Sequence, residues 1–330
     1  MTVIHHYSLD PHFNLAAEQY LLEGSGDVFL IWRNARSVII GKNQNAFGEV
    51  NVDFTEKSNI KVARRLTGGG AVFHDEGNIN YTFITDDSGD GIDFARFTEP
   101  VCEALASFGI SAALNGRNDL TVGEYKISGN AQCVYDTADG RKRLLHHGTI
   151  LFSADISEMA GSLRVNEEKL KSKGIKSVPS RVKNIRDMAE YKGPESPEEF
   201  ADALVKFAEA RFGEKSRDLT ENEKAAVSVI RDGKFALWEW NFGASPEYKS
   251  NTKRRFPYGT VEISYDSLHG IIERITVNGD FFGVESIAEL EKKLTGARLA
   301  KEDLIPRLED IGKYISGAVP DDIAGMIIGD

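Results

Sequence analysis

Cysteine and long apolar runs are both scarce in this sequence. Only two cysteines occur among the 330 residues, Cys102 and Cys133, and they show no CxxC spacing. This argues against a disulfide framework and a zinc site of paired thiolates, and it suits a reducing compartment. No apolar run approaches the roughly 20 residues that cross a bilayer, and the start of the chain lacks the basic and apolar regions of a secretory signal. We therefore expect a cytoplasmic protein without a membrane partner.

The common signatures of nucleotide binding and hydrolysis are also missing. The sequence contains no GxxxxGK[ST] loop and no GxGxxG motif that opens a helix after a strand. It also lacks the zincin spacing of histidines and the GxSxG nucleophile elbow. These absences exclude P-loop, dinucleotide-binding, zincin and serine-hydrolase chemistry of those types.

Acidic residues outnumber basic ones, 51 to 40, which gives a formal net charge of −11. Because phosphate backbones are bound by clustered cations, this argues against nucleic acid as a partner. One segment departs from the average, because residues 169–186, KLKSKGIKSVPSRVKNIR, carry seven basic residues and no acidic one. Such an island is suited to a phosphate-bearing small molecule or an acidic protein, although a plain basic loop has the same composition.

The first half of the chain has mostly strand character. The patterns predict helices over residues 13–24, 52–58 and 97–109, and strands over 28–33, 37–41, 61–66, 71–74, 79–84, 119–123, 125–135 and 144–153. The first two strands are joined by Asn34-Ala35-Arg36, which is typical of a hairpin. Because strands and helices do not alternate strictly, the pattern favours an α+β fold over a doubly wound one.

The second half changes to helix and loop. Residues 197–213 and 221–233 predict amphipathic helices, and the aromatic stretch ALWEWNFG at 236–243 predicts a strand. Residues 244–259, ASPEYKSNTKRRFPYG, are polar and rich in turn residues, which indicates a linker. Strands and then helices follow it. We therefore expect a large domain at 1–245 and a small C-terminal α+β domain at 246–330.

The stretch RRLTGGGAVFHD, residues 64–75, places three consecutive glycines after a basic pair. Gly68, Gly69 and Gly70 have no Cβ, so their backbone N–H groups are able to approach an anion at hydrogen-bond distance. A hairpin needs one or two glycines, so three of them favour a ligand-binding loop over a tight turn. Arg65 is close enough in sequence for its guanidinium to fold back onto the same ligand and bind a phosphate in bidentate fashion.

A lysine in a strand-like segment is the second candidate. Lys126 lies between Tyr125 and Ile127 and precedes small residues, which favours an ammonium group that points into a cleft, although an exposed edge-strand lysine fits equally well. Asp119 offers a carboxylate for Mg²⁺, with a turn cap as the alternative. The pair His146-His147 precedes an apolar strand, and structural histidines are as plausible there as catalytic ones.

Several stretches in fixed order resemble the lipoate–protein ligase A family of the biotin/lipoate A/B ligase superfamily. These are RRLTGGGAVFHDEGN, GRNDL with YKISGNAQ, HHGTILF, KGIKSVPSRVKNI and WEWNFG, and GKNQNAFGEVN and GDFFG extend the likeness over nearly the whole chain. The resemblance implies a large catalytic α+β domain with a mixed or antiparallel sheet, followed by a small accessory domain. It also implies that lipoate and MgATP give lipoyl-AMP and pyrophosphate, and that the lipoyl group then passes to a specific lysine.

The resemblance also implies roles for individual residues. It places ATP and lipoyl-AMP contacts on Arg65, Gly70, Ala71, Val72, Phe73, His74 and Lys126, lipoate contacts on Gly68, Gly69, Gly70, Lys126 and His147, and the adenylate loop on Lys176, Ser177 and Arg181. Lys126 is the catalytic residue in this scheme and Asp119 the candidate Mg²⁺ ligand. Thr67 stands where serine is usual, and Pro179 and Lys183 stand where relatives often carry Arg and Thr.

The implied partners are lipoyl domains of 2-oxoacid dehydrogenase E2 subunits and the glycine-cleavage H protein, with a monomer as the default state. Two other functions remain open from the sequence. One is an ATP-independent octanoyl or lipoyl transferase, for which Cys133 is the candidate nucleophile, although a structural cysteine is favoured at that position. The other is a non-catalytic lipoate- or adenylate-binding scaffold, and the presence of both Arg65 and Lys126 argues against it.

Overall fold

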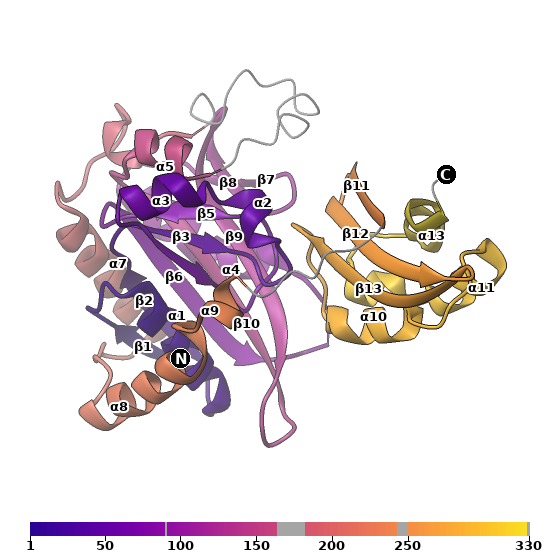
Figure 1. Cartoon of the computed structure of the whole chain (residues 1–330). Coiled ribbons are helices and arrows are strands. Elements are labelled where there is room, and N and C mark those ends of the chain that lie inside the picture. Colours follow the sequence, from indigo (N-terminus) through magenta and orange to yellow (C-terminus); the bar gives the residue numbers. More distant parts are fainter. Residues whose placement is uncertain (90, 164–181, 243–249, 329–330) are drawn as a thin grey trace.

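A computed structural model describes residues 1–89, 91–163, 182–242 and 250–328 of the chain. They form a large sheet-based domain and a smaller C-terminal domain beside it (Figure 1). This arrangement confirms the predicted α+β class. The predicted boundary between residues 245 and 246 lies outside the described residues.

A seven-stranded sheet organises the large domain, in the order β1-β2-β6-β10-β9-β8-β7. Its first pair, β1 and β2, is parallel, and the other neighbouring pairs are antiparallel. The strands are β1 (Thr2–His5), β2 (Val28–Arg33), β6 (Asn78–Asp86), β7 (Ala113–Asn115), β8 (Asp119–Val122), β9 (Tyr125–Asp136) and β10 (Lys142–Leu151). The long strands β6, β10 and β9 form its centre.

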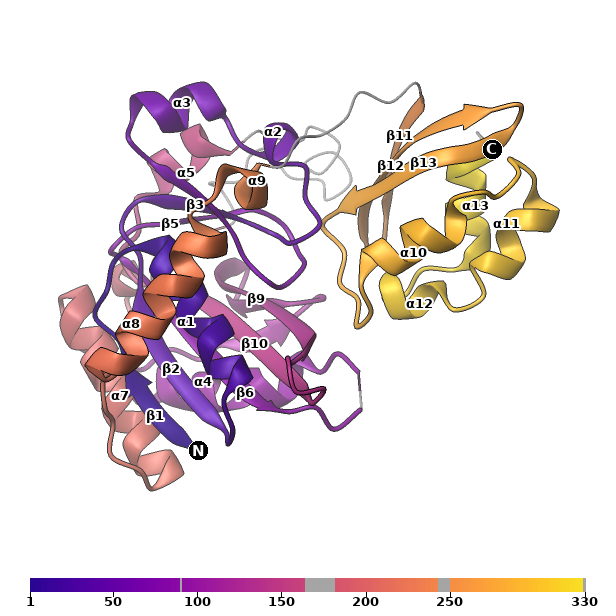
Figure 2. The same ribbon diagram turned by 60° about the horizontal axis from the view of Figure 1, so that its bottom comes forward.

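Helices cover both faces of this sheet (Figure 2). Helices α4 (Phe94–Ser107) and α7 (Pro197–Phe212) bury one apolar cluster, which includes Leu144. Helix α1 (Pro11–Glu23) buries another on the opposite face, which includes Leu145, and α8 (Glu221–Ile230) packs against α1. Successive side chains of a strand point to opposite faces, so neighbouring residues of β10 enter different cores.

A second sheet of three strands, ordered β4-β3-β5, carries the glycine-rich stretch. Its strands are β3 (Ser37–Ile40), β4 (Lys61–Arg64) and β5 (Val72–His74), and the short helices α2 (Ala46–Glu49), α3 (Val52–Lys57) and α5 (Ile156–Ser162) lie near it. The predicted hairpin between residues 28–33 and 37–41 is therefore wrong, because β2 and β3 belong to different sheets. The connection is a corner with one buried residue, Asn34, whose side chain accepts a hydrogen bond from Asn14 at 2.8 Å.

The aromatic stretch after α8 also differs from its prediction. A π-helical turn, η2 (Arg231–Phe235), leads into the short helix α9 (Trp238–Asn241), where a strand was predicted. Asn241 donates to the carbonyls of Phe235 and Leu237, and its Oδ1 accepts from the backbone N–H of Arg64 at 2.8 Å. The bond with Arg64 is a tertiary contact, which favours the helix over the strand that aromatic residues prefer.

The small domain has its own hydrophobic core. It consists of a sheet ordered β11-β12-β13 and four helices: β11 (Ser250–Phe256), β12 (Gly259–Leu268), β13 (Ile271–Gly279), α10 (Ile287–Leu294), α11 (Lys301–Arg307), α12 (Ile311–Tyr314) and α13 (Pro320–Ile328). Residues 250–256 are therefore a strand, and the predicted linker over 244–259 is wrong in this part. The error arises because β11 is an edge strand with mostly polar side chains, none of them buried, whose backbone pairs with β12.

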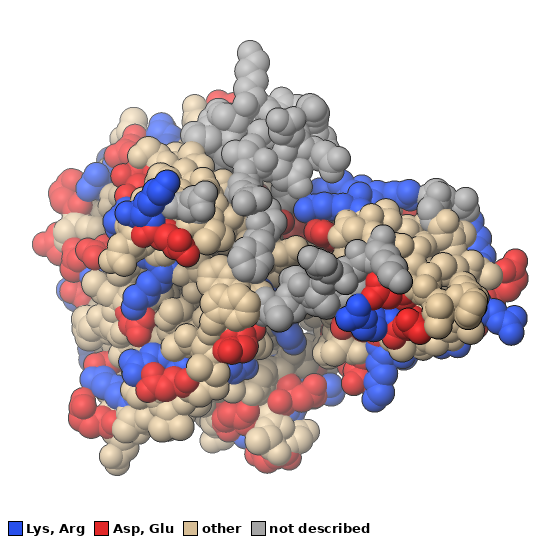
Figure 3. Space-filling view, in the orientation of Figure 1, with Lys and Arg blue, Asp and Glu red and all other residues tan. Residues whose placement is uncertain are grey.

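Charged side chains of both signs are interspersed over the face of the large domain seen in Figure 3. On the small domain, β11 carries Lys253, Arg254 and Arg255 in succession. Lys253 pairs with Glu262 at 3.5 Å and Arg255 with Asp280 at 3.0 Å. These two cations are thus partly compensated within their own domain. Among the described residues, no helix is both long and apolar enough to cross a membrane.

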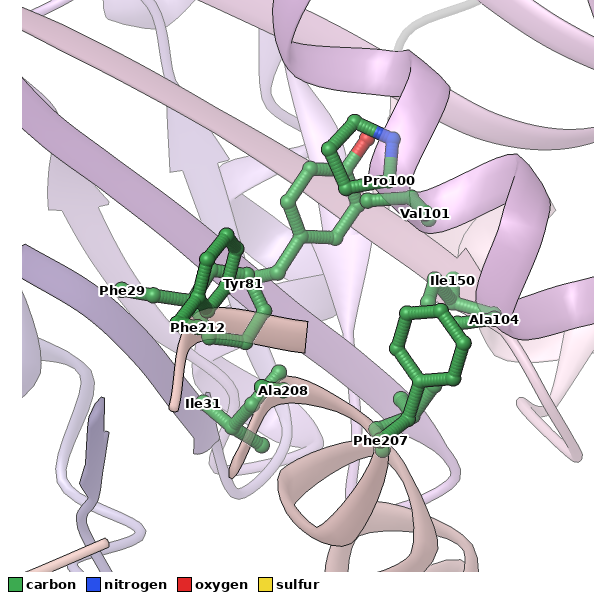
Figure 4. A pocket seen from close by; sticks show the side chains of 11 residues that line it. Phe29, Ile31, Tyr81, Pro100, Val101, Ala104, Ile150, Phe207, Ala208 and Phe212 are labelled. Atoms are coloured by element: carbon green, nitrogen blue, oxygen red, sulfur yellow. The ribbon is translucent and has the colours of Figure 1, made fainter. Parts of the chain in front are cut away.

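A small apolar cavity lies between α4, α7 and the sheet (Figure 4). Its lining includes Phe29, Tyr81, Val101, Phe207 and Phe212, and its volume is about 20 Å³. That volume holds roughly one water molecule. The cavity is therefore a packing defect and is too small for a substrate.

Candidate functional site

The glycine-rich stretch forms a loop between β4 and β5, and Arg65 lies beneath it. The guanidinium is fully enclosed, and its Nη2 donates to the carbonyl oxygens of Gly68 at 2.6 Å and Gly70 at 2.8 Å. Its Nη1 donates to the Ile39 carbonyl and its Nε to Thr67 Oγ1. Burial lowers the pKa of Arg65 to about 10, so the side chain stays charged at neutral pH. Arg65 therefore shapes the loop from within.

This position of Arg65 differs from the predicted fold-back onto a phosphate. A trans peptide unit directs its C=O and N–H to opposite sides. Carbonyls that turn toward Arg65 therefore direct the N–H groups of the same peptide units, those of Gly69 and Ala71, away from it. The cation therefore holds the loop carbonyls on one side, and of the two N–H groups on the other side that of Gly69 donates to the Phe281 carbonyl.

The three glycines have different reasons for lacking a side chain. A Cβ at Gly68 would collide with the carbonyl oxygen of Phe281. Gly69 has φ +88°, and a Cβ there would lie 3.1 Å from the ring of Phe282. A Cβ at Gly70 would meet nothing within 4 Å. The fold itself therefore requires Gly68 and Gly69, whereas no packing contact accounts for Gly70, which borders open space.

A further glycine, Gly41 at the end of β3, supports the loop from the side. A Cβ at this position would collide with the carbonyl oxygen of Gly69. The backbone of Lys42 also donates to the Thr67 carbonyl at 2.8 Å. The glycine loop therefore rests directly on the backbone that follows β3, an arrangement that the stretch GKNQN did not indicate.

Of the four residues 71–74 that follow the glycines, the first two are partly exposed and the last two are buried. Ala71 and Val72 lie at the surface of the loop, whereas Phe73 and His74 are buried at 2% and 3% exposure. His74 Nδ1 lies 3.0 Å from Asn34 Nδ2, and burial, aided by the charge of Arg65, lowers its pKa to about 3. His74 is thus neutral and behind the loop, so it contributes to the site through the position of β5.

His147 of β10 lies next to the loop, where the side chain of Thr67 meets it. His147 Nε2 is 2.8 Å from Thr67 Oγ1, and His147 Nδ1 is 2.9 Å from Glu18 Oε1. Glu18 belongs to α1, is fully buried, and was not singled out from the sequence. An acidic residue on the buried face of a predicted amphipathic helix was the available signal.

Lys126 forms an ion pair with Asp119 across β8 and β9. Its Nζ lies 2.7 Å from Asp119 Oδ1, and the side chains are 29% and 17% exposed. The register shifts here, because Thr121 pairs with Lys126 whereas Leu120 pairs with Ser128. This β-bulge adds Ile127 to β9 and changes which side chains share a face.

The bulge places Lys126 on the face that carries the glycine loop. A Cβ at Gly129 would lie 3.1 Å from Lys126 Nζ, so the amine folds over Gly129. Gly129 and Ala131 share one face of β9, and Ala131 pairs with His147. Ile127, in contrast, belongs to the core beneath α4 and α7. Lys126 and the glycine loop are thus on the same side of the sheet.

The end of the basic island joins this part of the site. Val182 forms a bridge with Lys126, and Lys183 N–H donates to the Lys126 carbonyl at 3.1 Å. The ammonium of Lys183 lies 5.1 Å from the centre of the Tyr125 ring. The predicted adenylate-loop residues Lys176, Ser177 and Arg181 lie outside the described residues.

A loop of the small domain, residues 279–283, covers the glycine loop. Gly69 N–H donates to the Phe281 carbonyl at 3.3 Å, and the Phe282 ring packs with Phe94 and Ala131. Arg117 of the large domain stacks on Phe282 at 4.6 Å and donates to the Asp280 carbonyl at 3.0 Å. The likeness in GDFFG therefore marks an interdomain contact.

The site offers few side chains that could ligate a metal ion. Among the described residues, no group of three or more His, Cys, Asp or Glu side chains could enclose a metal ion. Asp119 is the one predicted ligand, and it is paired with Lys126. A single carboxylate fits a Mg²⁺ ion that arrives with phosphate oxygens and keeps its waters, which is how Mg²⁺ binds at many nucleotide sites.

Family comparisons agree with this architecture. Residues 10–209 match the model of the lipoyl protein ligase A/B catalytic domain, and residues 245–327 match that of the bacterial lipoate protein ligase C-terminus. Lipoate–protein ligase 1 of Staphylococcus aureus is 41% identical over 309 residues, which cover 92% of each chain. The chain therefore belongs to the lipoyl protein ligase A/B family of ligases.

Solved structures share the fold. LipL1 of P. falciparum in complex with lipoate superposes with a TM-score of 0.82 at 24% identity, and the match covers 100% of this chain and 99% of that one. A bi-partite lipoate protein ligase of Thermoplasma acidophilum, studied with its E2 lipoyl domain, matches at 29% identity and a TM-score of 0.61, covering 76% and 98%. A lipoate-protein ligase A bound with ATP matches at 27% identity and a TM-score of 0.58, and the match covers 73% of this chain and 98% of that one.

The glycine assignment leads to a first prediction. Gly70→Val should retain the fold and lose at least roughly 10-fold in kcat/KM for lipoate ligation, because its side chain would extend into the open space beside the loop. Gly69→Val is the matched variant, since a positive φ and the Phe282 ring should make it lower the Tm. Equal loss of Tm in both variants, with activity retained in Gly70→Val, would contradict the assignment.

His74 leads to a prediction about acid stability. Its folded pKa of about 3 lies below the unfolded value of 6.5, so the unfolded chain binds the extra proton and stability falls as pH drops below 6.5. Between pH 6.5 and 5 this one histidine should lower the free energy of unfolding by about 2 kcal/mol, because each pH unit contributes up to about 1.36 kcal/mol. Urea unfolding of wild type and His74→Gln at pH 7 and 5 measures it, and the variant should lose less stability on acidification.

Proposed function

We propose that this chain is an ATP-dependent lipoate–protein ligase that works through an acyl-adenylate. Lipoate and MgATP would give lipoyl-AMP and pyrophosphate, and the lipoyl group would then form an amide with the ε-amine of a lysine on an acceptor protein. Family membership and a relative bound with ATP support the substrates. The single observation that carries the mechanism is the position of Lys126, on the face of the sheet that holds the glycine loop.

The adenylation step needs a cation where negative charge develops. The lipoate carboxylate attacks the α-phosphorus, a bond forms between its oxygen and phosphorus, and pyrophosphate leaves with its electron pair. Lys126 is suited to bridge the carboxylate and α-phosphate oxygens, because it is partly exposed and held by one carboxylate only among the described ion pairs. A fixed ammonium that stabilises developing charge is worth several kcal/mol in such steps.

The glycine loop supplies the other half of the nucleotide contact. Arg65 fixes its carbonyls on the inner side, so the backbone N–H of Ala71 is directed outward beside the open Gly70 position. Backbone N–H groups without a neighbouring Cβ are able to approach an anion closely. The loop would thus offer the Ala71 N–H as a donor, because the Gly69 N–H is already bonded to the Phe281 carbonyl.

Mg²⁺ enters this scheme as part of the nucleotide substrate. It would be held by phosphate oxygens with Asp119 as the protein ligand, and when bound it offsets phosphate charge. Contact of Asp119 with the metal would free Lys126 for the carboxylate and α-phosphate. The ion pair at 2.7 Å therefore keeps both groups in place for the same substrate.

The acceptor is a protein lysine in this proposal. The archaeal ligase that shares the fold was studied with its E2 lipoyl domain, which supports lipoyl domains as acceptors. We include the glycine-cleavage H protein on the resemblance of the motifs alone. Transfer forms the amide, releases AMP, and moves the proton of the acceptor amine to the departing phosphate or to solvent.

The ATP-independent transferase is the second candidate, and the environment of Cys133 disfavours it. Cys133 packs against the apolar cluster of α1, and burial raises the pKa of its thiol to about 12. A nucleophilic cysteine needs a lowered pKa, because the thiolate is the reacting form. Cys133 therefore fits a structural role.

Lys126→Ala is expected to reduce lipoate-dependent pyrophosphate release by at least roughly 10²-fold, because the cation at the α-phosphate is lost. The matched control is Lys142→Ala, which removes the same type of ion pair, with Asp136 at 2.9 Å, elsewhere on β9 and β10. That variant should keep the wild-type rate. A Lys126→Ala enzyme that still lipoylates an apo lipoyl domain at near wild-type rate would refute the mechanism.

Cys133→Ser is expected to lipoylate the acceptor at a rate within about 3-fold of wild type, since no covalent thioester forms. Intact-mass measurement of the acceptor, with and without ATP, follows the reaction. Modification that proceeds without ATP and disappears in Cys133→Ser would establish the transferase instead.

A further inference from the structure

Glu18 is a buried carboxyl group to which the reaction scheme above gives no role. It is 0% exposed and lies among the apolar residues between α1 and the sheet. Thr82 Oγ1 donates to its Oε1 at 2.6 Å, and His147 Nδ1 lies 2.9 Å from Oε1 and 3.2 Å from Oε2. A carboxyl group is costly to bury, so its hydrogen-bond partners have to explain its presence.

The partners form a continuous series that ends at the glycine loop. Arg65 Nε is able only to donate, and it donates to Thr67 Oγ1 at 3.0 Å. Thr67 Oγ1 lies 2.8 Å from His147 Nε2 and has its own hydrogen to offer. A neutral His147 that accepts this hydrogen at Nε2 carries its proton on Nδ1 and donates it to Glu18.

At the other end of the series the hydrogen bonds are also donated toward Glu18. Trp32 Nε1 is also a donor only, and it donates to Thr82 Oγ1 at 2.9 Å. Thr82 is therefore left to donate its hydroxyl hydrogen to Glu18. With hydrogen on His147 Nδ1, every hydrogen bond in the series runs toward the carboxyl group, which is then the common acceptor for both ends.

We infer that Glu18 is a positioning residue for the ligand-binding loop, an inference that rests on the proposed function. Glu18 holds His147 in the tautomer with hydrogen on Nδ1, so that Nε2 accepts from Thr67. Thr67 is thereby oriented to accept from Arg65, whose Nη2 sets the carbonyls of Gly68 and Gly70. A carboxyl group on α1 thus controls the loop through three intervening side chains.

The alternative is a carboxyl group that only stabilises the core. In that case the tautomer of His147 and the shape of the loop would not depend on Glu18, and its removal would lower the Tm without altering substrate affinity. The two readings therefore differ in a spectroscopic property and in a kinetic one. Both are measurable on the full chain.

The first test is nitrogen NMR of histidine-labelled protein, with the His147 signals identified by their loss in His147→Gln. Wild type should show hydrogen on Nδ1, and Glu18→Gln should keep it, because the amide oxygen still accepts. Glu18→Leu should shift the ring toward the Nε2–H form. Hydrogen on Nε2 in wild type, or an unchanged ring in Glu18→Leu, overturns the inference.

The second test is the KM for lipoate in pyrophosphate release. Glu18→Leu should lower kcat/KM about 10- to 100-fold through KM, the range expected when a buried donor loses its acceptor. Glu18→Gln should recover most of this loss. Thr67→Val interrupts the same series of hydrogen bonds. The double variant Glu18→Leu/Thr67→Val should therefore lose no more kcat/KM than the more impaired of the two single variants. Fully additive losses overturn the inference.

Two controls separate an effect on the loop from a general loss of stability. Glu291→Leu removes a half-buried carboxyl of the small domain, which accepts from Val277 N–H, and should lower the Tm with unchanged KM. If Glu18→Leu does not fold, Glu18→Gln and Thr67→Val still report through the NMR signal and KM. If wild type releases no pyrophosphate with lipoate and MgATP, the proposed function fails, whereas the NMR test still decides the role of Glu18.

Discussion

The candidate site depends on one buried cation, the guanidinium of Arg65. It binds the carbonyls of Gly68 and Gly70 from below, so the loop adopts one backbone shape and directs its N–H groups to the opposite side. Glycine gives a chain many conformations, and three in a row would be loose without such a contact. The buried charge thus fixes the backbone of a stretch that glycine alone would leave flexible.

The second determinant is the register of the large sheet. The extra residue Ile127 in β9 turns Lys126 onto the face of His147 and of the loop, while its own side chain enters the opposite core. Bulges often redirect a side chain beside a functional site. One inserted residue therefore brings the amine, the loop and the neighbouring Asp119 to one side of the protein.

Much of this arrangement was predictable from the sequence, because periodicity marked most strands and helices and the glycine motif marked the loop. Local pattern failed where distant contacts decide the structure. The 34–36 corner looked like a hairpin, but Asn34 is held by Asn14, and the aromatic stretch became α9 because Asn241 binds Arg64. Glu18 was missed for the same reason, since its role depends on partners from β6 and β10.

The stacking of Gly41 on the Gly69 carbonyl has a mechanical consequence. Two backbones in direct contact have no side chain between them that could change rotamer, so the floor of the site is stiff. The glycine loop also meets the backbone of Phe281 directly at Gly68, so among the described residues it is packed between two backbones, that of Gly41 and that of the loop at 279–283.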